Sequence, residues 1–262
     1  MCLILFSHEI HHRYRLIFAA NRDEFYDRPT LPAQFWNNSP NLLAGKDLKE
    51  GGTWMGITRT GRFAAITNFR EPANAIENGP SRGFLVLDFL ERNISPEQYL
   101  SDIKMIGGRY NGFNLLVGTH DNIFYFSNRQ NKIINILPGI YGLSNHLINT
   151  AWPKVTKGMR FLAKMTSKDN FPDIEEIFSL LQDRSKPPDH QLPSTGVSPE
   201  WEKVLSPLFI TSPTYGTRSS TILLWDRNGT IDFYERTFTP SGEDILGKET
   251  RTFRFHVQRV FK

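Results

Sequence analysis

The sequence holds a single cysteine, Cys2, among 262 residues. One cysteine excludes an intrachain disulfide and any zinc site built from several cysteines, and it favours a reducing compartment. No run of about 18 apolar residues occurs, so no integral membrane segment is expected. The apolar residues 2–6 are too few for a signal peptide and no basic segment precedes them, so the expected location is cytoplasmic.

Neither sign of charge dominates, because the sequence has 31 lysines and arginines and 27 aspartates and glutamates, which gives a net charge of +4 with histidine neutral. This bias is too weak to indicate a nucleic-acid partner, and it leaves acidic small molecules open as ligands. Hydrophobic residues make up 39% and charged residues 22%, which is typical of a globular protein with a sizeable core. We expect one domain over residues 1–262, with no boundary in the loop-like segment 185–199.

Apolar runs bounded by turn residues predict strands. Most consecutive strands read as hairpins, and the strand–helix–strand alternation of a parallel sheet is absent. The clearest hairpin joins residues 53–58 and 62–68 through a turn that contains Gly61. Other strands are expected at residues 2–6, 15–21, 113–119, 122–127, 132–137, 140–144, 219–225, 230–234 and within 248–262. Helices are expected at residues 81–90, 95–104, 153–165 and 173–181. The second of these begins with Ser95-Pro96-Glu97-Gln98, which predicts a cap by Ser95. This order predicts an α+β fold of antiparallel sheets whose outer faces are covered by helices.

Cys2 is the first candidate for chemistry. If Met1 is removed, Cys2 carries a thiol and a free α-amine on one residue, and an α-amine with a pKa of about 7.7–8.0 acts as a base near neutral pH. The thiolate is the reactive form of cysteine. The alternative is that Cys2 is a small apolar strand residue, since free cysteine is often buried.

Four polar residues, Asn21, Arg22, Asp23 and Glu24, stand where the second expected strand ends. If that strand forms a hairpin with residues 2–6, its end lies beside Cys2. Asp23 is then placed to accept a hydrogen bond from the α-amine, and Arg22 supplies positive charge. The alternative is a solvated turn with an internal ion pair, which contributes little to stability.

Three histidines, His8, His11 and His12, lie in the connection between the first two strands. Such a group is able to bind a metal or haem iron. No acidic residue or cysteine stands at a metal-ligand spacing from them, so we expect no metal site and favour a solvated hairpin turn.

These motifs form an ordered set that reaches from Cys2 to about Trp225, which is nearly the whole chain. The set consists of Cys2, residues 21–24, 28–29, 51–54, 66–70, 142–145, 152–154 and 217–219. It resembles the NRDE family, also called the transport and Golgi organisation protein 2 family. The resemblance implies a fold similar to N-terminal nucleophile hydrolases, a four-layer αββα sandwich of two antiparallel sheets.

The family is also distantly similar to cysteine-type members of that fold, such as penicillin V acylase, bile salt hydrolase and acid ceramidase. In those enzymes the second strand ends in Arg-Asn-x-Asp, where Asp23 matches the acidic position and Ala20 occupies the arginine position. Asn145 resembles the asparagine of their oxyanion hole, Asn68 is a further donor, and Arg218 matches a late active-site arginine. The alternative for both asparagines is that they only stabilise turns, where asparagine is a favoured residue.

The expected function is therefore hydrolysis of a non-peptide C–N amide bond in a small molecule, by an N-terminal cysteine and without a cofactor. Preorganised amide donors would stabilise the oxyanion that forms during attack. The expected catalytic residues are Cys2, Asp23, Asn145 and Asn68, and the expected substrate-binding residues are Arg22, Arg218 and Asn21.

The alternative function is a non-hydrolytic carrier or binding protein for a lipophilic ligand. The resemblance links eukaryotic members of the family to secretory organisation and to haem, acyl-CoA or lipid. Cys2 would then be an axial thiolate to haem or a wall of the ligand pocket. A purely structural role is the third interpretation, and the polar run from Asn21 to Glu24 argues against it. The sequence predicts no oligomeric state.

Overall fold

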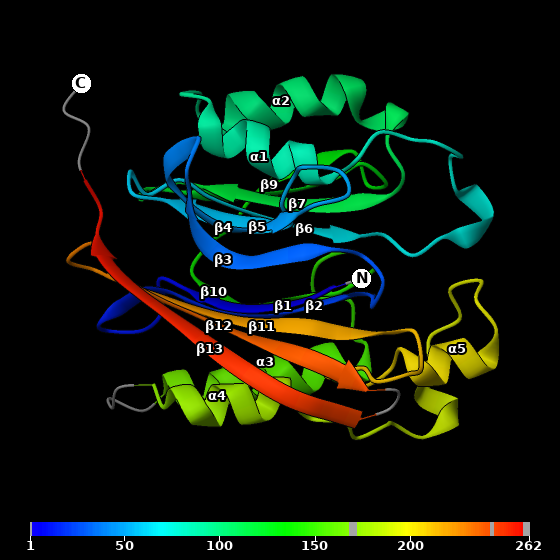
Figure 1. Cartoon of the computed structure of the whole chain (residues 1–262). Helices are drawn as coiled ribbons and strands as arrows, with labels where there is room; N and C mark the ends of the chain where they lie inside the picture. Colours follow the sequence, from blue (N-terminus) through cyan, green and yellow to red (C-terminus); the bar gives the residue numbers. More distant parts are fainter. Residues whose placement is uncertain (1, 168–171, 242–243, 259–262) are drawn as a thin grey trace. The chain divides into compact units, whose positions relative to one another are not determined.

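The computed structural model describes residues 2–167, 172–241 and 244–258. The chain divides into two compact units. The first unit consists of Met1–Asp27 and Leu137–Arg254, and the second of Arg28–Ile136 and Phe255–Lys262. Each unit has an antiparallel sheet of its own with helices packed on it, which confirms the expected α+β class (Figure 1).

The sheet of the first unit has six strands in the order β10-β1-β2-β11-β12-β13. Their bounds are β1 (Cys2–His8), β2 (Tyr14–Phe25), β10 (Gly139–Leu143), β11 (Tyr215–Asp226), β12 (Thr230–Ser241) and β13 (Asp244–His256). The helices of this unit are α3 (Pro153–Thr166), α4 (Ile174–Leu181), α5 (Pro199–Val204) and the short 3₁₀ helix Asp189–Gln191. The strand β1 therefore has a hydrogen-bonded neighbour on both sides.

Helices α3 and α4 pack on one face of this sheet. Alternate residues of β1 and β2, among them Leu5 and Ala19, form a core with Leu162 of α3 and Phe178 of α4. Gly158 lets α3 approach β1 closely, because a Cβ atom at this position would overlap the side chain of Leu5. Residues of β1 that alternate with Leu5, Cys2 included, point to the opposite face.

The sheet of the second unit has seven strands in sequence order. They are β3 (Thr30–Trp36), β4 (Ser39–Asp47), β5 (Met55–Thr58), β6 (Phe63–Asn68), β7 (Phe113–Gly118), β8 (Ile123–Ser127) and β9 (Lys132–Asn135). Helices α1 (Gly83–Glu91) and α2 (Pro96–Ile106) share a core with this sheet, and two 3₁₀ helices span Pro72–Asn74 and Gly107–Arg109. The predicted cap of α2 is confirmed, since the Ser95 hydroxyl accepts a hydrogen bond from the backbone N–H of Gln98.

The structure contains elements that the sequence patterns did not predict. Strands β3 and β4 and helix α5 are new, and β2, β11 and β12 are longer than expected. Part of the predicted C-terminal strand, residues 259–262, lies outside the described residues. Within the described segments, no helix has the length and apolar character needed to cross a membrane.

Candidate active site

The first hairpin places Cys2 at its open end, as predicted. Cys2 and Arg22 are Cα partners in the pairing of β1 with β2. On its other side β1 pairs with β10, where Ile4 is the partner of Leu143. The two residues that follow Leu143 are thereby carried toward Cys2. The ends of the first hairpin and the segment after β10, which is distant in sequence, therefore meet at this end of the sheet.

The Cys2 side chain is buried, with 7% of the residue exposed. Burial raises the pKa of the thiol above its ordinary value, and the negative charge of Asp23 acts in the same direction. The positive charges of the amino terminus and of Arg22, together with a hydrogen bond from the backbone N–H of Asp23, lower the pKa without reversing this shift. Burial therefore disfavours the thiolate, which is the reactive form of Cys2.

Ser144 connects Cys2 to Asn145. Its hydroxyl oxygen lies 3.3 Å from the carbonyl oxygen of Cys2 and 3.2 Å from Oδ1 of Asn145, so one hydrogen is shared between two acceptors. Asn145 is fully buried, and this contact sets which end of its amide faces Ser144. Sequence reasoning did not single out Ser144, although it lies within the motif of residues 142–145.

The carboxylate of Asp23 is buried and held by β11. Asp23 is the Cα partner of Thr217, whose hydroxyl donates to Oδ1 at 2.7 Å. The Thr217 oxygen also accepts a hydrogen bond of 3.0 Å from the backbone N–H of Ile210. Thr217 was likewise missed as a site residue, because its partner lies near the opposite end of the chain.

Asn21 points to the helix-covered face of the sheet rather than toward Cys2. Its amide nitrogen donates to the carbonyl oxygens of Leu181 and Leu208, each at 2.8 Å, and its oxygen accepts from the Ser220 hydroxyl at 2.6 Å. These bonds use both amide hydrogens inside the core. Asn21 therefore holds the C-terminal end of α4 and the segment after α5, and it is not part of the proposed substrate site.

Arg218 and Arg22 lie near each other. The pairing of β11 with β2 is irregular between Thr217 and Ser219, and Arg218 stands at this irregularity. Its guanidinium donates to the backbone oxygens of Phe25 and Tyr26 at 2.8 and 3.2 Å. Burial lowers the pKa of Arg218, and the like charge of Arg22 lowers it further. Two cations thus share this end of the sheet.

Asn68 is the last residue of β6, where it pairs with Phe113 of β7. It belongs to the second unit. It is therefore not among the residues that β1, β2, β10 and β11 bring together, and its donor role stays a prediction.

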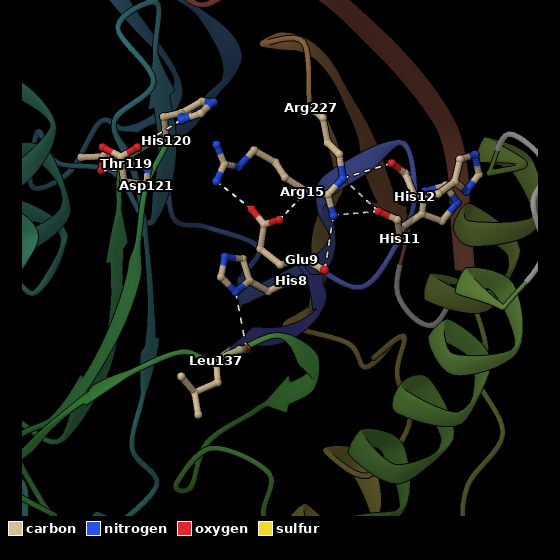
Figure 2. A network of polar contacts seen from close by, with 10 residues as sticks. All are labelled: His8, Glu9, His11, His12, Arg15, Thr119, His120, Asp121, Leu137 and Arg227. Atoms are coloured by element: carbon tan, nitrogen blue, oxygen red, sulfur yellow. Dashed lines mark hydrogen bonds and ion pairs between the residues drawn. The ribbon is translucent and has the colours of Figure 1, made fainter.

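The predicted solvated turn of histidines is wrong for two of the three. His8 and His11 are buried, and Nδ1 of His11 accepts hydrogen bonds from the backbone N–H groups of Arg13 and Tyr14. The turn is packed because it lies under the guanidinium of Arg227, which bonds to backbone oxygens of the turn and to Glu9 (Figure 2). Among the described residues, no three His, Cys, Asp or Glu side chains gather as a metal site.

A family model described as Transport and Golgi organisation 2 matches residues 1–240. The chain belongs to the Transport and Golgi organisation 2 family. The Transport and Golgi organization protein 2 homolog of Homo sapiens is 36% identical over 278 residues, which span 98% of this chain and all of that protein. The Transport and Golgi organization protein 2 of Drosophila melanogaster is 27% identical, over 100% of this chain and 99% of its own.

Solved structures extend the likeness beyond the Transport and Golgi organisation 2 family. A mutant conjugated bile acid hydrolase from Clostridium perfringens matches with a TM-score of 0.51 and 11% identity, covering 100% of this chain and 99% of that one. The Caenorhabditis elegans ortholog of N-acylethanolamine-hydrolyzing acid amidase matches with a TM-score of 0.50 and 8% identity, covering 85% and 92%. At such identities the likeness shows the fold alone, and it confirms the expected N-terminal nucleophile hydrolase-like fold.

Proposed function

We propose that the chain is an N-terminal cysteine amidohydrolase that cleaves a non-peptide C–N amide bond in a small molecule. The observation that carries the proposal is the convergence of Cys2, Asp23 and Asn145 at one end of the six-stranded sheet. A nucleophile, an acidic group next to it and a buried amide are the parts that such a reaction requires.

The proposed reaction begins with removal of Met1, which frees the α-amine of Cys2. The amine takes the thiol proton, and the sulfur attacks the carbonyl carbon of the substrate amide. Asn145 stabilises the oxyanion, and Asp23 orients the amine. The C–N bond then breaks, the departing amine takes the proton, and a thioester on Cys2 is left for water to hydrolyse.

The names of the two structural neighbours support this reaction class. One is called an N-acylethanolamine-hydrolyzing acid amidase and the other a conjugated bile acid hydrolase. The latter was solved as a mutant with the cysteine at its second position replaced by alanine. In this chain the cysteine also stands second, at the start of the strand β1.

Arg22 and Arg218 are proposed to bind an anionic part of the substrate, and Asn68 remains a further candidate donor to the oxyanion. A reducing compartment such as the cytoplasm suits a reaction that depends on one free thiol. No step of this proposal needs a cofactor.

The first test is the intact mass of the untagged protein, followed by an acyl-transfer assay with activated acyl esters. A chain lighter by one methionine that gains a single acyl group on Cys2 is the expected result. Cys2→Ala and Cys2→Ser should lose the acyl adduct while keeping the thermal stability of the wild type. Retention of Met1, or equal labelling of Cys2→Ala, would contradict the proposal.

A second candidate function is carriage of a lipophilic ligand such as haem, acyl-CoA or lipid. The observation in its favour is that the Cys2 thiol is buried with a raised pKa, as befits a residue in a pocket wall. Native mass spectrometry and absorbance of the purified protein separate the two. A retained ligand on a chain that keeps Met1 would favour carriage.

A further inference from the structure

We infer that Arg22, Ser219 and Thr221 form a binding site for one carboxylate, on the sheet face that carries Cys2. As a statement about the substrate, the inference rests on the proposed amide hydrolysis. As a statement about anion binding, it does not depend on any turnover.

The register of three neighbouring strands brings these side chains onto one face. Arg22 is the Cα partner of Cys2 on one side and of Ser219 on the other. Thr221 is the partner of Ala20, two residues before Arg22, so it occupies the diagonal position next to Arg22. Directly opposed residues in antiparallel strands lie on the same side, about 4.5–5.5 Å apart. The intervening residues Asn21 and Ser220 bond to each other on the other face.

Arg22 is a largely buried cation whose hydrogen-bonding capacity is not used by the residues that the structure describes. Only 8% of the residue is exposed, yet its guanidinium makes no hydrogen bond or ion pair with any described residue. A buried charge without a partner is costly, and proteins nearly always compensate it. A guanidinium presents two parallel N–H groups that match the two oxygens of a carboxylate.

Thr221 provides an independent second observation. It is fully buried, and within the described part of the chain its hydroxyl has no hydrogen-bond partner. The Ser219 hydroxyl, on the same face, also makes no side-chain hydrogen bond to a described residue. An unsatisfied buried hydroxyl is uncommon in folded proteins, and here that of Thr221 lies diagonally across from the unpaired guanidinium of Arg22. One bound oxyanion would satisfy all three groups.

The charge of the surroundings favours an anion as well. Asp23 follows Arg22 directly, but its carboxylate is directed to Thr217 and forms no ion pair with Arg22. Arg218 adds a second positive charge near Arg22. A substrate that reaches the Cys2 sulfur would therefore place its carboxylate one strand away from the reacting carbonyl. The substrate class is an acidic amide whose carboxylate lies within a few bonds of the scissile carbon.

The test compares alkylation of Cys2 by iodoacetate and by iodoacetamide, which carry out the same displacement at the same sulfur. The thiolate forms a new S–C bond, iodide leaves, and the thiol proton goes to solvent. We expect the iodoacetate-to-iodoacetamide rate ratio to exceed that of glutathione, measured in parallel, by about tenfold. A ratio equal to that of glutathione would overturn the inference.

Variants assign the effect to the site. Arg22→Met should remove the preference, Arg22→Lys should keep part of it, and Thr221→Val should reduce it several-fold without a change of volume. Arg160→Met, at an exposed arginine of α3, is the matched control and should keep the wild-type ratio. An unchanged ratio in both Arg22→Met and Thr221→Val contradicts the site. If Arg22→Met does not fold, Thr221→Val and Arg22→Lys decide.

A second measurement covers the case in which Cys2 reacts with neither reagent. Sodium acetate should raise the midpoint of thermal unfolding above that in sodium chloride at equal ionic strength. The rise should persist in Cys2→Ala, become smaller in Thr221→Val and disappear in Arg22→Met. A rise in Cys2→Ala without amidase activity in the wild type would refute the proposed function and leave the anion site standing. No difference between the salts would refute the anion site alone.

Discussion

Thr217 donates its hydroxyl to the carboxylate of Asp23 at 2.7 Å, although 194 residues separate the two in the chain. The same oxygen accepts a hydrogen bond from the backbone N–H of Ile210. Since that N–H occupies one side of the oxygen, the hydroxyl hydrogen is directed to Asp23. The orientation of this carboxylate therefore depends on the C-terminal half of the chain as much as on β2.

Replacing Thr217 should show how strongly this contact is needed. Thr217→Val keeps the shape but leaves the buried Asp23 oxygen and the Ile210 N–H without their partner, which we expect to cost about 1–3 kcal/mol of unfolding free energy. Thr217→Ser keeps the hydroxyl and should retain most of the stability. Urea unfolding of both variants checks this, and equal losses in the two would refute the assigned role.

Asn149 holds the turn that follows Asn145. Its φ of 60° lies in the left-handed region, and its backbone N–H and side-chain oxygen bond to the backbone of Gly142. Asn149→Gly loses only the side-chain bond, whereas Asn149→Ala also takes on the steric cost of positive φ, about 1–2 kcal/mol. We expect stability to fall in the order wild type, Asn149→Gly, Asn149→Ala in thermal unfolding. The reverse order of the two variants would show that the turn relaxes to another conformation.

The hairpin that carries Cys2 should be sensitive to acid through Glu9. Burial tends to raise the pKa of Glu9, but hydrogen bonds and charges of Arg227 and Arg15 outweigh it and hold the pKa below its usual range (Figure 2). Because the folded pKa lies below the unfolded one, the ionised carboxylate stabilises the fold above about pH 4.3. This stabilisation is lost as the pH falls through the folded pKa.

The variant Glu9→Gln tests this linkage. The wild type should be more stable than the variant by about 1–2 kcal/mol at pH 7, and the difference should shrink steadily as the pH falls below about 5. Guanidinium unfolding at several pH values measures it. Glu77→Gln, at an exposed position, is the control and should show no such trend. If the stability difference between wild type and Glu9→Gln grew as the pH fell, the pKa of Glu9 would be raised by folding rather than lowered, which would contradict the prediction.

Gly158 sets the separation of α3 from β1. Gly158→Ala gains about 1 kcal/mol of helix propensity, but the new methyl group overlaps the buried side chain of Leu5, and overpacking typically costs about 1–3 kcal/mol. We therefore expect a net loss of stability. Gly108→Ala, whose Cβ meets no atom within 4 Å, should be neutral or mildly stabilising. Combining Gly158→Ala with Leu5→Ala should cost less than the sum of the two single changes.

The sequence predicted the helices and strands in which buried apolar residues recur at a regular spacing. The Ser-Pro-Glu start of α2 was identified, yet the same start at Ser198 caps α5, which was missed because it lies beside a Pro-rich loop. Strands β3 and β4 were missed because exposed and buried residues are mixed along them. β3 is an edge strand, where Pro32 is tolerated and no second neighbour enforces the alternation.

The candidate site was predictable only where one hairpin determines it. The pairing of Cys2 with Arg22 follows from the hairpin itself. The contacts of Ser144 and Thr217 depend on β10 and β11, whose places beside β1 and β2 are set by long-range pairing. The core position of Asn21 also follows from that pairing, since its partners belong to residues 181, 208 and 220.

The pairing of β2 with β11 has a consequence for synthesis of the protein. Asn21 and Ser220, which are bonded partners, lie 199 residues apart, so a ribosome needs about 10–40 s between making the two. During that interval the edge of β2 that β11 will occupy lacks its strand, while the second unit already has residues 28–136 available for folding. The hairpin that holds the thiol is thus synthesised first but gains its last neighbouring strand only when β11 has been made. A chain that stalls before β11 leaves the edge of β2 unpaired, where it can aggregate or bind a chaperone.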